Sequence, residues 1–283
     1  MPAFTNIATL TYNGNTVNSN VVTGQILEAL TVTKTAVLPE YSIGEDVTYV
    51  VSMINRGTVA YEELTITDDL GAYTVDGQTQ YPMTYTPNSV RYYVNGVLQG
   101  VPTVTAGPPL VITGITVPAG GNAMVIYEAR TNAYAPVALG STIVNTVTVT
   151  GDRLEEPIAA EETVTVAQKA DPVITKALDP MVVPENGQLT YTFIIRNYGN
   201  IPLVATDDVV LTDVFNPTLE NIAVTFEGEP WVPGVNYNYN QTTGVFNTLP
   251  GRIVVPAATY TQNPDGTWAI MPGTVNLTVT GTI

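Results

Sequence analysis

Two long segments of the chain repeat one pattern, and this repeat limits the fold more than any other feature of the sequence. TVTKTAVLPEYSIGEDVTYVVSMINRG in the first half matches VITKALDPMVVPENGQLTYTFIIRNYG in the second. An internal repeat of this length predicts two tandem domains of the same fold. The matched residue pairs are Lys34/Lys176, Tyr49/Tyr191, Asn55/Asn197, Gly57/Gly199 and, further along each copy, Asp68/Asp213.

Each copy alternates apolar and polar residues over short segments, as half-buried β-strands do. These segments are 30–37, 47–55, 64–70, 123–130 and 145–151 in the first copy, and 173–179, 189–197, 209–215, 222–226 and 274–281 in the second. The 23 Gly and 21 Pro supply turns between them. Because no segment keeps a helical period, the sequence predicts an all-β chain of two tandem immunoglobulin-like β-sandwich domains.

The charge balance and the missing residue types exclude several functions. The chain holds 9 Lys and Arg against 25 Asp and Glu, and its net charge of −16 repels nucleic acid and anionic membrane surfaces. It has no Cys for disulfides or thiolate metal sites, and no His, the commonest general base and metal ligand. We therefore expect no cofactor, no metal, and no enzyme activity beyond autocatalytic isopeptide formation.

The order of the motifs, K…G…TY…N.G…TD…N.A.VT, resembles the tandem repeat of bacterial surface proteins grouped as domain of unknown function 11. The resemblance covers nearly the whole chain. It implies an immunoglobulin-like sandwich in an extracellular protein of the bacterial cell or spore surface, often in long arrays, with no enzymatic activity. No apolar run is long enough to predict a membrane span, and no signal peptide is visible.

A segment typical of a closing strand stands at the start of the chain. NIATLTYNG and NTVTVTGDR, aligned on Asn6 and Asn145, share one alternation. Asn145 lies 111 residues after Lys34, and the same spacing from Lys176 reaches position 287, beyond Ile283. We therefore expect the second domain to lack its closing strand. The predicted units are a donor-strand arm over 1–27, a first sandwich over 28–168 and a second sandwich over 169–283.

A sandwich that lacks a strand has unpaired edges, which readily accept a strand from elsewhere. About six residues, spanning roughly 20 Å, separate a turn expected near Gly24 from the strand at Leu30, too few to reach past the first domain. The arm is therefore expected to complete the second domain of a neighbouring copy, and such head-to-tail contacts propagate into a filament. Residues 15–27 either add a second strand or cross to the first domain. The donor residues are Asn6, Ala8, Leu10 and Tyr12.

The leading hypothesis is thus a self-assembling, pilus-like homopolymer on the bacterial surface, with an unspecified tip, base or surface ligand as further partners. The alternative is a monomeric surface adhesin or surface-layer stalk whose loops bind a carbohydrate or envelope ligand. In that case the arm would be a solvated extension.

Strand alternation also places two sets of polar residues on apolar faces. Desolvation shifts a lysine towards the free amine and an aspartate towards the neutral acid. A free amine beside an asparagine carbonyl can attack it and expel ammonia. The sets resemble the Lys–Asp–Asn sets of intramolecular isopeptide domains in Gram-positive surface adhesins, although a hydrogen-bonded ion pair without chemistry would explain the pattern equally well. The sets are Lys34, Asp68 and Asn145 within the first domain, and Lys176, Asp213 and Asn6 between subunits.

Overall fold

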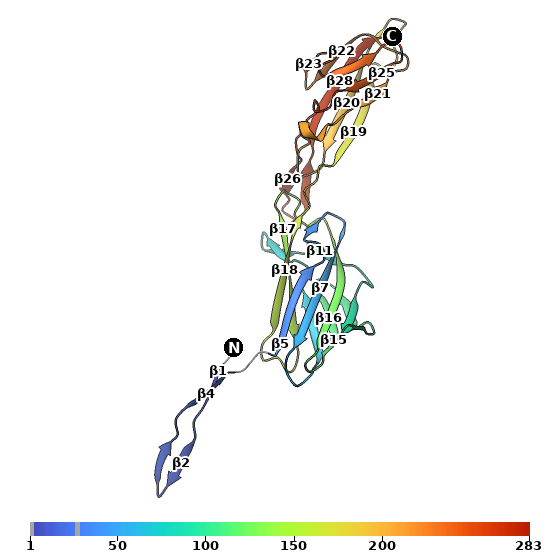
Figure 1. Ribbon diagram of the computed structural model, residues 1–283. Helices are drawn as coiled ribbons and strands as arrows, with labels where there is room; N and C mark the ends of the chain where they lie inside the picture. Colours follow the sequence, from blue (N-terminus) through green and yellow to red (C-terminus); the bar gives the residue numbers. More distant parts are fainter. Residues whose placement is uncertain (1–2, 26–28) are drawn as a thin grey trace.

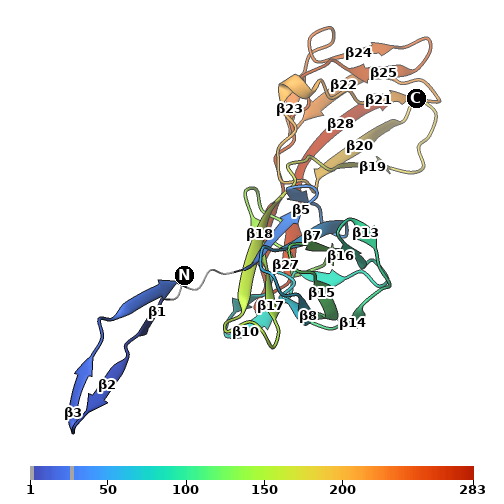
Figure 2. The same cartoon turned by 60° about the horizontal axis from the view of Figure 1, so that its bottom comes forward.

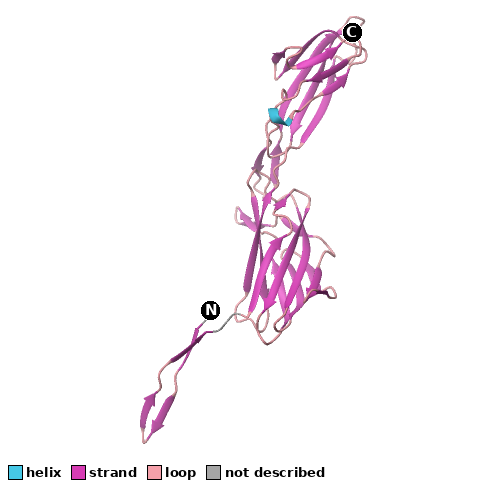
Figure 3. Ribbon diagram, in the orientation of Figure 1, coloured by secondary structure: helices cyan, strands magenta, loops and turns pink. Residues whose placement is uncertain are grey.

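The computed structural model describes residues 3–25 and 29–283. Figure 1 shows a hairpin arm at one end, followed by two sandwiches, with the C-terminus at the far end of the second. Within the described residues, the only helical element is the short 3-10 turn η1 (Ala205–Asp207), drawn in cyan in Figure 3. The predicted all-β fold of two sandwiches is therefore confirmed. No helix in these ranges is long and apolar enough to cross a membrane.

The arm is a two-stranded antiparallel hairpin that extends from the first sandwich (Figure 2). Its turn lies at Asn13 and Gly14, whose φ angles of 46° and 78° suit the tight turn that an Asn-Gly pair favours. The prediction of a turn near Gly24 is wrong, because Gly24 lies inside β4 (Val22–Gln25), the returning strand of the arm. Residues 1, 2, 26 and 27 of the predicted arm lie outside the described residues. The arm strands are β1 (Ala3–Asn6), paired with β4, and β2 (Thr9–Tyr12), paired with β3 (Asn15–Asn18).

The first sandwich consists of two sheets that face each other. The first sheet runs β13 (Val97–Leu98), β12 (Arg91–Val94), β16 (Asn122–Thr131), β7 (Asp46–Asn55) and β5 (Leu30–Ala36), with β11 (Met83–Tyr85) also on β16. The second runs β14 (Thr103–Ala106), β15 (Leu110–Val117), β8 (Tyr61–Asp68), β17 (Thr142–Thr150), β18 (Ile158–Val166) and β6 (Glu40–Tyr41). A small hairpin of β9 (Tyr73–Val75) and β10 (Gln78–Gln80) stands apart.

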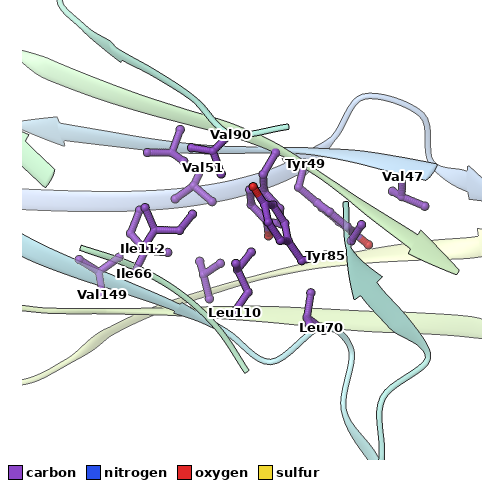
Figure 4. Close-up of a cluster of buried hydrophobic side chains, with 14 of the residues drawn as sticks. Val47, Tyr49, Val51, Ile66, Leu70, Tyr85, Val90, Leu110, Ile112 and Val149 are labelled. Atoms are coloured by element: carbon purple, nitrogen blue, oxygen red, sulfur yellow. The ribbon is translucent and has the colours of Figure 1, made fainter. Parts of the chain in front are cut away.

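Alternate residues of these strands fill the space between the sheets (Figure 4). Val51 on β7 faces Ile66 on β8, Ile112 on β15 and Val149 on β17, and all four are buried. Burying one such side chain stabilises the fold by about 1.5–3 kcal/mol. The period-two pattern of the sequence therefore becomes the core of the sandwich.

The second sandwich has one sheet of five strands and one of three. The larger sheet runs β19 (Pro172–Asp179), β20 (Gln188–Asn197), β28 (Gly273–Thr282), β22 (Glu220–Phe226) and β23 (Glu229–Trp231). The smaller runs β21 (Thr212–Val214), β25 (Val245–Thr248) and β24 (Tyr237–Asn240). A further hairpin of β26 (Thr259–Gln262) and β27 (Trp268–Met271) reaches the first sandwich, where Gln262 donates to the Tyr73 hydroxyl at 3.0 Å.

Matched asparagines show that the two copies fold alike. Asn55 donates to the Val59 carbonyl at 2.8 Å and accepts from the Gly57 amide at 2.9 Å. Asn197 donates to the Ile201 carbonyl at 2.8 Å and accepts from the Gly199 amide at 2.9 Å. The strand registers agree as well, because Lys34 pairs with Val51 and Lys176 pairs with Phe193, which is the same spacing. The internal repeat is thus a repeat of structure.

Candidate functional site

The two sandwiches differ at one sheet edge. In the first sandwich β8 lies between β15 and β17, and the β17–β18 hairpin extends the sheet beyond it. In the second sandwich the matching strand, β21, pairs only with β25 among residues 29–283. The other edge of β21 therefore carries unpaired backbone groups, and no described strand takes the places of β17 and β18. Such an edge is a template for an added strand.

The uncovered edge also exposes the strand across from it. In the first sandwich β18 packs on β5, and Leu30 and Lys34 of β5 are buried. In the second, seven of the eight residues of the matching strand β19 are exposed, including Ile174 on the inner face. β5 pairs with β7 in the same register in which β19 pairs with β20. The difference in exposure between β5 and β19 is therefore explained by the absence of a described counterpart of the β17–β18 hairpin. The inner face of the second sandwich is therefore uncovered between β19 and β21, where the side chains of Ile174 and Lys176 are exposed, and this uncovered face is called the groove below.

The first Lys–Asp–Asn set is assembled inside the first sandwich. Lys34 Nζ lies 2.6 Å from Asp68 Oδ2, and the two side chains are 0% and 1% exposed. The Tyr127 hydroxyl donates to the same carboxylate oxygen, and Lys34 Nζ lies 4.7 Å from the centre of the Tyr49 ring. Burial lowers the pKa of Lys34, and the Asp68 carboxylate opposes this shift. The net effect moves the lysine towards the free amine.

Asn145 completes this set from β17. Its Oδ1 accepts from the Gly71 amide at 3.2 Å, whereas its buried Nδ2 has no hydrogen-bond partner among the described residues. Asn145 also lies near the Tyr49 and Tyr127 hydroxyls and opposes the rise that burial causes in the pKa of both. The Asn145 side chain is thus held inside the first sandwich between the Gly71 amide and the two tyrosine hydroxyls.

The second set is incomplete within one chain. Lys176 is paired with Asp213, but their side chains are 38% and 19% exposed, because no strand within residues 3–25 and 29–283 covers them. Asn6, the third residue of the set, lies in β1 of the arm. Three aromatic rings surround the ammonium group, with centres at 4.3 Å for Tyr191, 5.4 Å for Phe193 and 5.4 Å for Phe215.

Two contributors to the first site were missed by the sequence analysis. Tyr127 follows the inward alternation of β16, so its burial was visible in the pattern, but its contact with Asp68 depends on how the two sheets face each other. Asp69 directly follows β8 and is the second contributor. Its Oδ1 accepts from the Gly71 and Thr146 amides, both at 2.9 Å, and so fixes β17 beside Asp68. No group of three metal-ligating side chains occurs in the described ranges.

The difference in burial predicts different costs for removing the two aspartates. Asp68→Ala should destabilise the first sandwich by about 3–5 kcal/mol, because it leaves Lys34 buried without its partner. Asp213→Ala in the unassembled protein should cost only about 0–1 kcal/mol, because solvent already screens that pair. Urea unfolding of the two variants measures both values. Equal losses would contradict the difference in burial.

Comparisons with known proteins find solved structures that are similar to this chain at low sequence identity. No family model matches it, and no curated protein sequence matches it. It is similar to the pilus backbone RrgB of Streptococcus pneumoniae, at 13% identity and a TM-score of 0.36, over 90% of this chain and 50% of that one. It is also similar to the major pilin BcpA of Bacillus cereus, at 13% identity and a TM-score of 0.38, over 96% of this chain and 73% of that one. A fragment of the major pilin GBS80 of Streptococcus agalactiae gives 15% identity and a TM-score of 0.35, over 86% and 85%. The fold itself rests on the strands and sheets described above.

Proposed function

We propose that this protein is the structural subunit of an extracellular fibre in which the arm of one subunit completes the second sandwich of the next. The observation that supports this most is the open groove between β19 and β21, at the place where β17 and β18 close the first sandwich. The motif resemblance to bacterial surface repeats supports a location on the cell or spore surface. The fibre is a homopolymer and needs no cofactor.

The arm has the properties expected of a hairpin that fills the place of β17 and β18 in the second sandwich. Every described side chain from Phe4 to Thr23 is exposed, and Leu10 is 64% exposed. An isolated two-stranded hairpin is only marginally stable in water. Burial of Phe4 and Leu10 in a groove would contribute about 1.5–3 kcal/mol for each side chain. Both the arm and the groove therefore gain stability from the same contact.

The positions of the arm and the groove favour contacts between different subunits over a contact within one subunit. The arm extends from the first sandwich, on the side away from the second sandwich (Figure 1). A few residues between Gln25 and Leu30 span at most about 3.6 Å each, so the arm does not reach the groove of its own chain. A head-to-tail contact between unlike surfaces repeats from subunit to subunit. The contact therefore builds a filament.

We further propose that the two lysine sets form isopeptide bonds. In each set the free lysine amine attacks the asparagine Cγ, a new Nζ–Cγ amide bond forms, and the Cγ–Nδ2 bond breaks. The aspartate carries a proton from the amine to the departing nitrogen, which leaves as ammonia. Lys34 would bond to Asn145 within the first sandwich. Asn6 of one subunit would bond to Lys176 of the next subunit, which makes the fibre one covalent chain.

Removal of the arm tests the fibre function. Purified full-length protein should form filaments in negative-stain microscopy, and a variant lacking residues 1–26 should remain a folded monomer. Adding the truncated variant to full-length protein should shorten the filaments, since it offers a groove but no arm and so stops growth at one end. Monodisperse monomer from both proteins would overturn the proposal and favour the monomeric adhesin or stalk.

A further inference from the structure

We propose that the arm enters the neighbouring sandwich as an intact two-stranded hairpin, in the register of the β17–β18 hairpin. This inference rests on the proposed function and specifies how the two copies fit. The first arm strand, β1 and β2, takes the place of β17 beside β21. The returning strand, β3 and β4, takes the place of β18 over β19. The recipient sandwich thereby gains two strands.

The pairing within the arm matches the pairing within the β17–β18 hairpin. Asn145 pairs with Glu162, and Val149 pairs with Ile158. In the arm, Asn6 pairs with Val22 and Leu10 pairs with Val17. When Asn6 is placed on Asn145, Leu10 falls on Val149 and its partner Val17 falls on Ile158. The arm is therefore already folded in the required register, apart from one extra residue near Ser19, whose hydroxyl accepts from the Ala8 amide at 2.9 Å.

A pair of buried aliphatic residues in the β17–β18 hairpin corresponds to an aromatic residue and a glycine in the arm. Ile143 and Val164 are cross-strand partners at the end of the β17–β18 hairpin, and both are buried. The matching partners in the arm are Phe4 and Gly24. The Phe4 ring lies across Gly24, so close that a Cβ there would be 2.3 Å from the ring. The aromatic ring thus fills the space of two aliphatic side chains, which requires that both arm strands enter together.

The recipient also has an unpaired segment for the returning strand. In the first sandwich β18 pairs in parallel with β6, where Thr165 faces Glu40 and Val166 faces Tyr41. The matching residues of the second sandwich, Val182 and Val183, form no strand, and Met181 and Val182 are each 87% exposed. A single strand in the place of β17 would leave the backbone of residues 182 and 183 without a partner strand. A hairpin supplies that partner, because its β4 ends at Gln25, which falls on Thr165, the residue that pairs with Glu40 in the first sandwich.

Engineered disulfides test the register of the first arm strand, and the absence of native cysteine removes competing thiols. Thr148 pairs with Thr67 in the first sandwich, and the matching residues are Thr9 of the arm and Thr212 of β21. Directly opposed strand residues lie about 4.5–5.5 Å apart at Cα, within the range that a disulfide spans. The double variant T9C/T212C should therefore convert mildly oxidised filaments into a ladder of disulfide-linked multimers. To exclude isopeptide ladders, all cysteine variants carry N6A, and the gels are run with and without reductant.

Two control variants make this result specific. T67C/T148C in the same background should form a disulfide within one chain, which shows that the native register permits the bond. T9C/V210C is displaced by two residues and should leave monomers after detergent treatment. If T9C/V210C links and T9C/T212C does not, the register is wrong although strand donation stands. If no variant or wild-type protein forms filaments, the proposed function itself fails.

Hydrogen exchange tests the second arm strand. Backbone amides in peptides that span residues 180–184 should exchange more slowly in wild-type filaments than in protein lacking residues 1–26. Peptides from the outer β22–β23 hairpin serve as the internal reference and should not change. Disulfide formation by T9C/T212C together with unchanged exchange at 180–184 would mean that one strand alone is donated. That result would overturn the hairpin proposal and leave the fibre function intact.

Discussion

Replacing Leu10 with aspartate should abolish filament assembly and leave both sandwiches folded. In the proposed register Leu10 takes the place of Val149, which is fully buried in the first sandwich. An unpaired carboxylate at such a position costs several kcal/mol, and each 1.4 kcal/mol lowers an association constant about tenfold. In the free subunit Leu10 is exposed, so the substitution leaves the sandwiches unaffected. Sedimentation of the filaments and the urea unfolding curve of the monomer measure these two expectations.

Thr11→Asp is the matched control for Leu10→Asp. Thr11 is the next residue of β2 and points to the opposite face, because strand side chains alternate. The same charge on that face should leave assembly largely intact. Normal filaments from Leu10→Asp would show that the inward face of the arm is wrongly assigned. Loss of filaments in both variants would show that assembly is sensitive to the charge of the arm and not to its buried face.

The sequence was sufficient to predict the parts of the fold that depend on local periodicity. The inward positions of Lys34, Asp68 and Asn145 followed from alternation along three separate strands, and all three residues are buried. The same reasoning placed Lys176 and Asp213 on inner faces, but their exposure depends on a neighbouring strand that alternation does not reveal. Periodicity therefore predicts which way a side chain points and not what covers it.

Features that depend on neighbouring strands could not be predicted in this way. Residues 209–215 alternate like a full strand, yet β21 covers only Thr212–Val214. The matching β8 is eight residues long and has partners on both sides. A strand with one partner has half of the cross-strand contacts that stabilise a sheet, which explains the shorter β21. A strand at the other edge of β21 should therefore lengthen it.

The β26–β27 hairpin is another feature without a clear sequence signal, and it has a consequence for the fibre. It joins the two sandwiches of one chain through Gln262 and through Gly266, which packs against Gln80. The matching place in the first sandwich, between β15 and β16, holds only the short turn over residues 118–121. In the proposed fibre the first sandwich follows the arm, so this contact is absent at each junction between subunits. Junctions stabilised by this hairpin within each subunit would therefore alternate along the fibre with junctions between subunits that lack it.

If Asn6 of one subunit bonds to Lys176 of the next, wild-type filaments boiled in detergent should leave a ladder of multimers. The intact mass of each multimer should be lower than the sum of its subunits by one ammonia for every bond formed. Asn6→Ala should reduce the ladder to monomer, because the attacked carbonyl is lost. It should leave non-covalent filaments in place, because Ala8 and Leu10 still fill the groove. Gel electrophoresis and mass spectrometry of the same filaments measure both effects.

Asn145→Ala is the matched control, because it removes the same amide from the set within one subunit. It should keep the ladder and lose one ammonia fewer per subunit than wild-type protein. Asp213→Ala should behave like Asn6→Ala, since Lys176 has no second carboxylate at the positions that match Asp69 and Glu162, which are Val214 and, in the arm, Val22. Both of those acids act on Lys34 in the first sandwich. The inter-subunit bond thus depends on a single proton carrier. Wild-type filaments that boil to monomer of unmodified mass would refute the covalent bonds and leave the ion pairs as structural elements only.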